Sequence, residues 1–314
     1  MKSKILISIL FSSLLLTACG GGSTDSNNND SFQGTEKLDY TKKENIAFIS
    51  EPVVNLSNEY DNPVINIGTV AHEIYSLIRN ADPEKYTVSC QSGTTKINND
   101  GSVSLNNCKN LIIHSTQRSI LVFGEDETTI LSGTIQSKTS TSSTFERTDL
   151  TLTNFNFDLA DEIHTVNGNI STTSTSVSPD LNRVLFEANK FTYQFVDKTN
   201  KSNNQKYILN DYVLTSNYSD STGNIENIAK GQLNGNNNGK IFSVNFNSKV
   251  PFYDQRSLEH LQPSNAIIEI NDINNKQNSI SITETVDGQA LINAYADGHS
   301  VQGFPQTVNW IDFY

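Results

Sequence analysis

The sequence predicts a mainly β fold: an antiparallel meander sheet, curved or half-barrel-like, with one amphipathic helix near the N-terminus. Two observations predict the sheet. Apolar and polar residues alternate with a period of two in several runs, such as Phe191–Phe195 and Phe242–Phe246. Polar turn sequences rich in Asn, Asp, Gly and Ser separate these runs, for example at 198–205, 234–239 and 271–278. We expect each strand to pair with its neighbours along the chain.

Residues 1–18 are expected to be a cleaved export signal. Lys2 and Lys4 give this segment a positive start, and Ile5–Leu16 forms an apolar stretch of 12 residues. Such a stretch is too short to span a membrane, which requires about 20 apolar residues. Small residues then lead directly into a cysteine in the run Leu16-Thr17-Ala18-Cys19.

This run resembles the lipobox of bacterial lipoproteins. The resemblance implies that the Cys19 thiol receives a diacylglycerol, that cleavage occurs before Cys19, and that the new amine is acylated. It also implies that the partners are the membrane and the machinery that exports and sorts lipoproteins. Several acyl chains anchor a protein stably, since each buried methylene contributes about 0.8 kcal/mol. A plain secretory signal with a chance cysteine is the alternative.

Residue 20 bears on the destination of the anchored chain. In enterobacterial lipoproteins an aspartate at this position retains the protein at the inner membrane, whereas this chain has Gly20. The resemblance therefore implies an outer-membrane location and leaves open which side of that membrane the protein faces. Residues 19–45 are expected to be the lipidated cysteine and a flexible linker, because Gly20–Gly34 is rich in Gly, Ser and Asn.

The predicted helix lies in the segment 46–85, which is expected to contain strand and helix. Four apolar residues within Ile65–Arg79 recur at helical spacing and form one stripe: Val70, Ile74, Leu77 and Ile78. Asp82-Pro83 follows and is expected to prevent the helix from continuing, because a residue before proline disfavours the helical conformation.

Residues 86–314 are expected to form the β-sheet domain. Between Leu150 and Leu159 the apolar positions change parity, which indicates one inserted residue, and hence a β-bulge, near Thr153-Asn154. A short pattern with a central glycine also recurs, at 131–135, 166–170 and 229–233. Its spacings are unequal, so we interpret it as a pattern of strand starts and not as a strict repeat.

Cys90 and Cys108 are the cysteines that remain once Cys19 is assigned to the anchor. A single pair in an exported chain predicts a disulfide. Tyr86–Cys90 and Ser102–Cys108 are expected to be neighbouring strands joined through a turn at 99–101. No redox or metal role is expected for the pair, because the sequence has no Cys-x-x-Cys and no histidine at ligand spacing.

Two stretches carry a further resemblance. Their motifs are Cys90-x-x-Gly93, Asn107-Cys108 and Leu131-Ser-Gly133-Thr in the first stretch, and Pro263, Ile268-Glu-Ile270, Asp297-Gly298 and Thr307-Val-Asn-Trp310 in the second. Both are similar to a group of proteobacterial outer-membrane lipoproteins that has no firm biochemical function. The resemblance covers about half of the mature chain and implies only the location and a β architecture. Asp297-Gly298 lacks the fuller acidic turn of the group, so no cation site is assigned there.

Composition argues against some classes of partner. The net charge is −12, with 34 acidic and 22 basic residues. This balance repels phosphate backbones, so nucleic-acid binding is not expected. Solubility is the simplest explanation of the charge.

No residue set points to a metal, a cofactor or a catalytic centre. Asn234, Asn236, Asn238 and Gly239 match a calcium loop in type, but Asn245 stands where a bidentate glutamate is needed, which favours a solvated turn. His72-Glu73 begins like a zinc-protease helix, but Ser76 replaces the second histidine, so we interpret it as a surface helix pair.

Aromatic residues are the remaining candidates for a site. Five of them could line a groove for a sugar or a lipid, although cross-strand core pairs are favoured: Tyr193, Phe195, Tyr207, Tyr212 and Tyr218. The leading hypothesis is a non-enzymatic structural or binding component of the envelope, anchored in the outer membrane. One alternative is a carrier of an apolar ligand in a curved sheet that the Val70–Ile78 stripe closes. The other is a hydrolase with a dispersed site. The sequence has no nucleophile motif, but the residues of a catalytic triad can lie far apart in a sequence.

Overall fold

A computed structural model describes the chain over residues 36–59, 62–82, 84–115, 119–121, 129–200, 204–237, 239–255 and 266–313. The export signal, Cys19 and most of the expected linker lie outside these residues. Within them, no helix is both long and apolar enough to cross a membrane.

The sheet confirms the predicted fold class. Its strands form one large antiparallel meander that does not close on itself, with β1 added in parallel to β11. The strands are β1 (Glu36–Lys37), β2 (Tyr86–Ile97), β3 (Val103–Ser115), β4 (Ser119–Leu121), β5 (Ile130–Thr141), β6 (Phe145–Asp158), β7 (Glu162–Ser178), β8 (Leu181–Asp197), β9 (Gln205–Ser219), β10 (Asn224–Asn237), β11 (Lys240–Val250), β12 (Phe252–Gln255), β13 (Ile267–Asp272), β14 (Ser279–Glu284), β15 (Ala290–Ala296), β16 (His299–Ser300) and β17 (Gln306–Val308). A short 3-10 helix, Trp310–Phe313, follows β17.

Two helices precede the sheet, and the expectation of one is wrong. The predicted helix is α2, Pro63–Arg79, whose first turn is capped by Asn62: its Oδ1 accepts hydrogen bonds from the backbone N–H groups of Val64 and Ile65. The additional helix is α1, Lys43–Leu56. Pro52 stands inside it, and interior proline is a strong signal against a helix in a sequence. Burial of its apolar face against the sheet overrides that signal.

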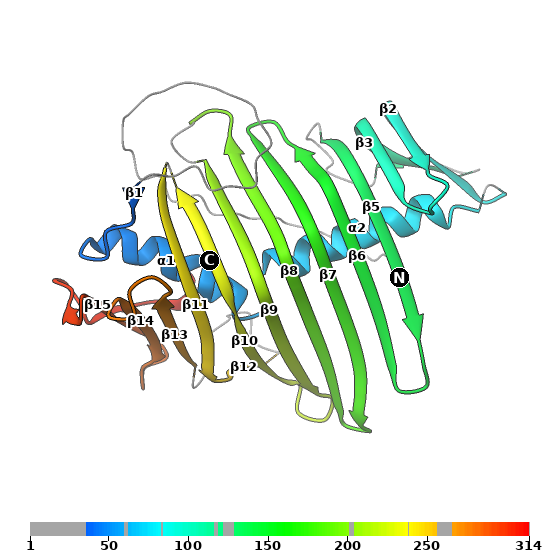
Figure 1. The fold of residues 1–314 in the computed structure, drawn as a ribbon. Coiled ribbons are helices and arrows are strands. Elements are labelled where there is room, and N and C mark those ends of the chain that lie inside the picture. The colour runs from blue at the N-terminus through cyan, green and yellow to red at the C-terminus, as the bar shows by residue number, and fades with distance from the viewer. Residues whose placement is uncertain are drawn as a thin grey trace.

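The helices lie end to end across one face of the sheet (Figure 1). Along α2, Gly68 faces Ile170 of β7 and Leu150 of β6, then His72 reaches β5, and the hydroxyl of Tyr75 donates to the carbonyl oxygen of Gly101 beyond β2. The absent side chain of Gly68 allows this close approach. The fold is therefore two layers, with the helices crossing the strands.

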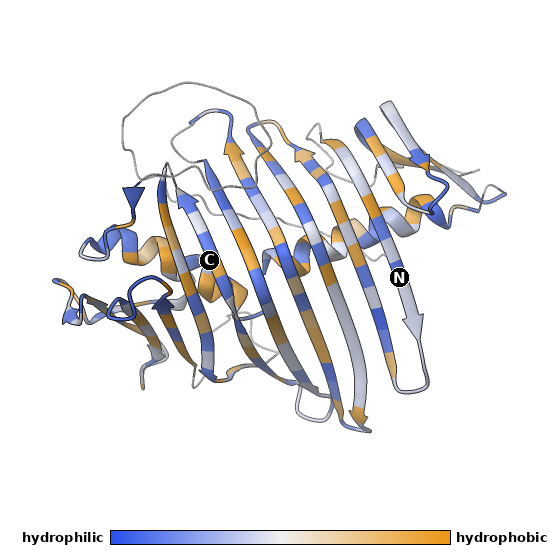
Figure 2. Ribbon diagram, viewed as in Figure 1, coloured by the Kyte–Doolittle hydropathy of each residue, from blue (hydrophilic) through white to orange (hydrophobic). Residues whose placement is uncertain are grey.

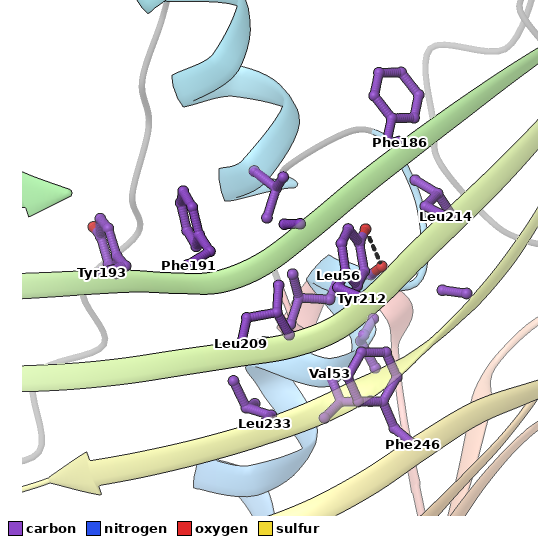
Figure 3. Close-up of a cluster of buried hydrophobic side chains, with 14 of the residues drawn as sticks. Val53, Leu56, Phe186, Phe191, Tyr193, Leu209, Tyr212, Leu214, Leu233 and Phe246 are labelled. Carbon is purple, nitrogen blue, oxygen red and sulfur yellow. Dashed lines mark hydrogen bonds between the residues drawn. The ribbon is translucent and has the colours of Figure 1, made fainter. Parts of the chain in front are cut away.

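The hydrophobic core fills the space between the helices and this face of the sheet. Apolar and polar residues alternate along the central strands, as Figure 2 shows, because one face of each strand is covered and the other faces solvent. Tyr212 of β9 makes hydrogen bonds at the junction of the two helices. Its hydroxyl donates to the carbonyl oxygen of Leu56, at the end of α1, at 2.8 Å (Figure 3). The same hydroxyl accepts from Nδ2 of Asn62, which caps α2, also at 2.8 Å.

The strand pair β2 and β3 confirms the prediction for the two cysteines. Cys90 and Cys108 form a disulfide with a Cα–Cα distance of 5.1 Å. The strands that carry them are antiparallel neighbours, and the predicted turn at 99–101 connects them.

A line of β-bulges crosses the sheet and includes the predicted one. The pairing of β6 with β7 shifts between Leu152 and Phe155, and Asn154 takes a positive φ of 47°. Neighbouring strands carry matching irregularities, which form a continuous line: Gly93 (β2), Asn107 (β3), Gly133 (β5), Asn154 (β6), Gly168 (β7), Lys190 (β8), Asp211 (β9) and Gly231 (β10).

This line explains the recurring glycine pattern and corrects its interpretation. Gly133, Gly168 and Gly231 lie inside β5, β7 and β10 and not at their starts. A Cβ on Gly133 would lie 2.2 Å from the carbonyl oxygen of Asn154, and one on Gly168 would lie 2.7 Å from that of Lys190. Glycine is required at positions 133 and 168 because the bulged backbone of the next strand occupies the space that a side chain would need.

Candidate functional site

The residues considered for metal binding take structural positions. Asn234 and Asn236 belong to β10 and Asn245 to β11, and Asn236 Oδ1 accepts a hydrogen bond from the Gly239 N–H in the connecting turn. Asn238 lies outside the described residues. Across the described chain, no three His, Cys, Asp or Glu side chains are grouped so that they could hold a metal ion.

The prediction that His72 and Glu73 form a surface pair is wrong for His72. Its ring Nδ1 lies 3.1 Å from Ser137 Oγ of β5, so the histidine is half-buried between helix and sheet. The apolar stripe of the predicted helix did not reveal that His72 faces the sheet, because only aliphatic residues were counted in it.

An aromatic row crosses the helix-covered face of the sheet. Tyr193 of β8 pairs directly with Tyr207 of β9, which pairs with Gly235 of β10, which pairs with Phe242 of β11. A Cβ on Gly235 would lie 2.0 Å from the Phe242 ring, so this ring covers the glycine. The missing side chain in β10 therefore lets Phe242 lie flat on the strand.

Helix α1 packs an aromatic ring and a carboxylate beside this row. The ring of Phe48 stacks on Tyr207 with centroids 6.3 Å apart and meets Phe242 edge-on at 5.5 Å. Glu51 lies on the same side of α1, three residues further on, and its negative charge acts on the Tyr207 hydroxyl.

A histidine and a second carboxylate continue the row onto β7. His164 is 6% exposed, and its Nδ1 shares a hydrogen bond of 2.7 Å with the Tyr193 hydroxyl. Its Nε2 lies 2.9 Å from Glu162 Oε1, and its ring lies 5.3 Å from that of Phe195. We call the whole set the aromatic recess: Phe48, Glu51, Glu162, His164, Tyr193, Phe195, Tyr207 and Phe242.

Glu51 is the unusual member of the aromatic recess. Within the part of the chain that the structure describes, it makes no hydrogen bond and no ion pair. Surrounding protein desolvates its carboxyl group and raises the pKa, although the side chain is exposed to solvent.

The two tyrosines remain protonated at neutral pH. Burial raises the pKa of Tyr193 and Tyr207 strongly, and the negative charges of Glu162 and Glu51, respectively, raise them further. Their hydroxyl groups are therefore polar, uncharged contacts, and the Tyr207 hydroxyl donates to Gln205 Oε1 at 3.1 Å. A phenol in this state is a poor nucleophile.

Replacing Glu51 tests whether this carboxylate is held unpaired. Its pKa is higher in the folded chain than the value near 4.5 in the unfolded chain. Ionisation of Glu51 therefore lowers the free energy of unfolding as the pH rises through these two pKa values. Glu51→Gln is therefore expected to raise the midpoint of thermal unfolding at pH 7 but to leave it unchanged below about pH 4, where both side chains are neutral. Scanning calorimetry at several pH values measures this.

The control for this prediction is Glu146→Gln, at an exposed position at the start of β6. It is expected to leave the midpoint unchanged at either pH. A wild-type chain more stable than Glu51→Gln at pH 7 would mean that the carboxylate has a favourable partner.

The sequence identified part of the aromatic recess. Of the five aromatic candidates, Tyr193, Phe195 and Tyr207 come together there, whereas Tyr212 is buried at the helix junction. Tyr218 lies elsewhere and donates a hydrogen bond to Glu59. Sequence reasoning missed Phe48 and Glu51 because they lie on the helix that Pro52 obscured. The alternation of Glu162 and His164 along β7 was the available signal for that pair.

Comparisons with protein-family models, curated proteins and solved structures find no match to this chain.

Proposed function

We propose that this chain is a lipoprotein anchored in the outer membrane, and that it binds a ligand in the aromatic recess without catalysing a reaction. The observation that carries the proposal is the position of Glu51, an exposed carboxylate with no partner among the described residues, three residues along α1 from Phe48, whose ring stacks on Tyr207. Unpaired polar groups beside exposed aromatic surface are typical of ligand sites, where the ligand supplies the missing contacts.

The position of the N-terminal strand supports the same proposal. β1 pairs with Lys240 and Ile241, and the next residue is Phe242 of the aromatic recess. β1 thus lies at the end of the sheet where the aromatic recess lies (Figure 1), and residues 20–35 join it to Cys19 in the sequence. If Cys19 is lipidated, the linker holds this end within tens of ångströms of the membrane, on the order expected for a flexible chain of its length.

The alternative of a hydrolase is favoured by one observation, the arrangement of Glu162, His164 and Tyr193. It places a carboxylate, an imidazole and a hydroxyl in sequence, as in a catalytic triad. The raised pKa of the Tyr193 hydroxyl argues for a positioning role instead. Turnover of p-nitrophenyl acetate that His164→Gln abolishes without unfolding the chain would support the hydrolase over the binding protein.

Metabolic labelling tests the anchor. Cells that express the wild-type chain are expected to incorporate radioactive palmitate into it and to carry it in outer-membrane fractions. Cys19→Ser should incorporate none, because acylation starts at this thiol. Equal labelling of both chains would refute the lipoprotein assignment.

A neutral apolar dye tests binding in the aromatic recess. N-phenyl-1-naphthylamine is expected to gain fluorescence with the mature chain carrying Cys19→Ser, which has no acyl chains to compete for the dye. Phe48→Ala should weaken its binding about tenfold, because it removes a stacked ring. Phe145→Ala removes a ring at the exposed start of β6 and should have no effect. No binding, or equal losses in both variants, would reject the aromatic recess as a ligand site.

A further inference from the structure

We infer that Asp287 is a site of spontaneous isoaspartate formation in the folded chain. The backbone nitrogen of the next residue, Gly288, attacks the side-chain carboxyl carbon of Asp287. The N–H proton and the carboxyl hydroxyl leave together as water, and a succinimide ring forms. Addition of water then opens the ring on either side. One product is the original aspartate, and in the other the backbone runs through the side chain. Water is the only other reactant.

The sequence alone does not distinguish Asp287 from two other aspartates. The reaction favours a following glycine, because no side chain hinders access to its nitrogen. Three Asp-Gly pairs occur in the chain, at 100–101, 287–288 and 297–298. All three aspartates are exposed, and all three glycines have a positive φ, between 73° and 81°. Each glycine N–H also donates a backbone hydrogen bond. The contacts of each aspartate therefore decide between the pairs.

Hydrogen bonds from Ser102 hold the carboxyl group of Asp100. Its Oδ1 accepts from the Ser102 hydroxyl at 2.7 Å and from the Ser102 backbone N–H at 3.0 Å. The carboxyl must break both bonds before it rotates toward the Gly101 nitrogen. The bond from the hydroxyl, and then the bond from the backbone, lower the pKa of Asp100. The protonated carboxyl, from which water leaves, is therefore also less abundant.

Residues of another turn, the one between β13 and β14, hold Asp297. Its Oδ1 accepts from Asn275 Nδ2 at 2.7 Å, and its backbone N–H donates to Asn278 Oδ1 at 2.9 Å. The N–H of Gly298 donates to the carbonyl oxygen of Gln277 at 3.0 Å. Rotation of Asp297 toward the attacking nitrogen breaks these contacts, so the fold protects this residue as well.

Asp287 lacks such restraints. It lies in the turn between β14 and β15, next to the fully exposed Val286. Among the described residues, its carboxyl group takes part in no hydrogen bond and no ion pair. The N–H of Gly288 donates to the carbonyl oxygen of Thr285 at 3.0 Å, a bond within the same turn. Such a bond opens without separating the strands, so the carboxyl reaches the Gly288 nitrogen in the native fold.

Mass spectrometry of aged protein tests the inference. The mature chain carrying Cys19→Ser is kept at pH 7, and chymotrypsin then separates Asp287 from Asp297 by cleaving after Tyr295. Electron-transfer dissociation locates the isoaspartate. We expect it to form at Asp287 about tenfold faster than at Asp100 or Asp297, the factor that one hydrogen bond of ordinary strength supplies. Deamidation of asparagine changes the mass of a peptide and is thus distinguished from this isomerisation.

Two controls assign the difference to the fold. In urea, the unfolded chain should form isoaspartate at similar rates at the three positions, because each aspartate precedes a glycine. Ser102→Ala removes the hydroxyl that holds Asp100 and should raise the rate there severalfold, with the rate at Asp287 unchanged. Equal rates at the three positions in the folded chain, or a rate at Asp287 no higher than at Asp297, would overturn the inference.

Discussion

Gly133→Ala is expected to cost about 3 kcal/mol or more of folding free energy. Gly133 has a φ of +101°, a conformation that strains any residue with a side chain. The new Cβ would also lie 2.2 Å from the carbonyl oxygen of Asn154. This oxygen belongs to the bulged backbone of β6 and cannot withdraw without breaking the pairing of β5 with β6. Thermal unfolding should shift down by roughly 6 to 12 °C for a chain of this size.

Gly101→Ala is the matched control. Gly101 also has a positive φ, +81°, but no heavy atom lies within 4 Å of the position that its Cβ would take. Its replacement should cost about 1 kcal/mol, from backbone strain alone. The difference between the two variants therefore measures the steric requirement of the bulge line. Equal losses of folding free energy in both variants would show that the bulges tolerate a side chain. Glycine would then be needed only for its positive φ.

Removal of the disulfide is expected to have the second large effect. The double variant Cys90→Ala with Cys108→Ala should lose about 3 kcal/mol, because the unfolded chain regains the entropy of a loop with a sequence separation of 18 residues. The loss should appear first in β2, because β3 is the strand with which it pairs among the described residues. Hydrogen exchange of the β2 amides and urea unfolding measure the local and global effects.

Reduction of the wild-type chain is the control for this prediction. Dithiothreitol should reproduce the destabilisation of the double variant, while the double variant itself should not respond to it. Alanine suits the buried Cys108 better than serine, which would bury a hydroxyl group. A double variant as stable as the oxidised wild type would show that β2 and β3 are held by pairing and by α2 alone.

Local patterns determined the strands and the irregularities within them. The alternation of Phe191 to Phe195 predicts a half-covered strand because a pleated strand presents successive side chains to opposite faces. The change of parity before Phe155 predicts the bulge because one extra residue moves every later side chain to the other face. Both signals are local, and the structure confirms both.

Helix α1 shows where local patterns fail. Pro52 costs about 3 kcal/mol inside a helix and so argues against one. Burial of apolar residues such as Ile49 and Val53 against the sheet outweighs this cost. That surface is built from strands more than a hundred residues later in the chain, so the helix is visible only after the sheet is in place.

The sequence by itself determined the antiparallel meander, the bulge at Asn154, the disulfide and helix α2, because each depends on neighbours in the chain or on a single possible pair. Tertiary structure alone decided the aromatic recess and the alignment of the bulges on neighbouring strands into one line. The recess joins Glu51 of α1 to Tyr207 of β9, and the bulge line joins eight strands. Such contacts depend on strand register and on how the helices cross the sheet, which are set by packing over the whole domain.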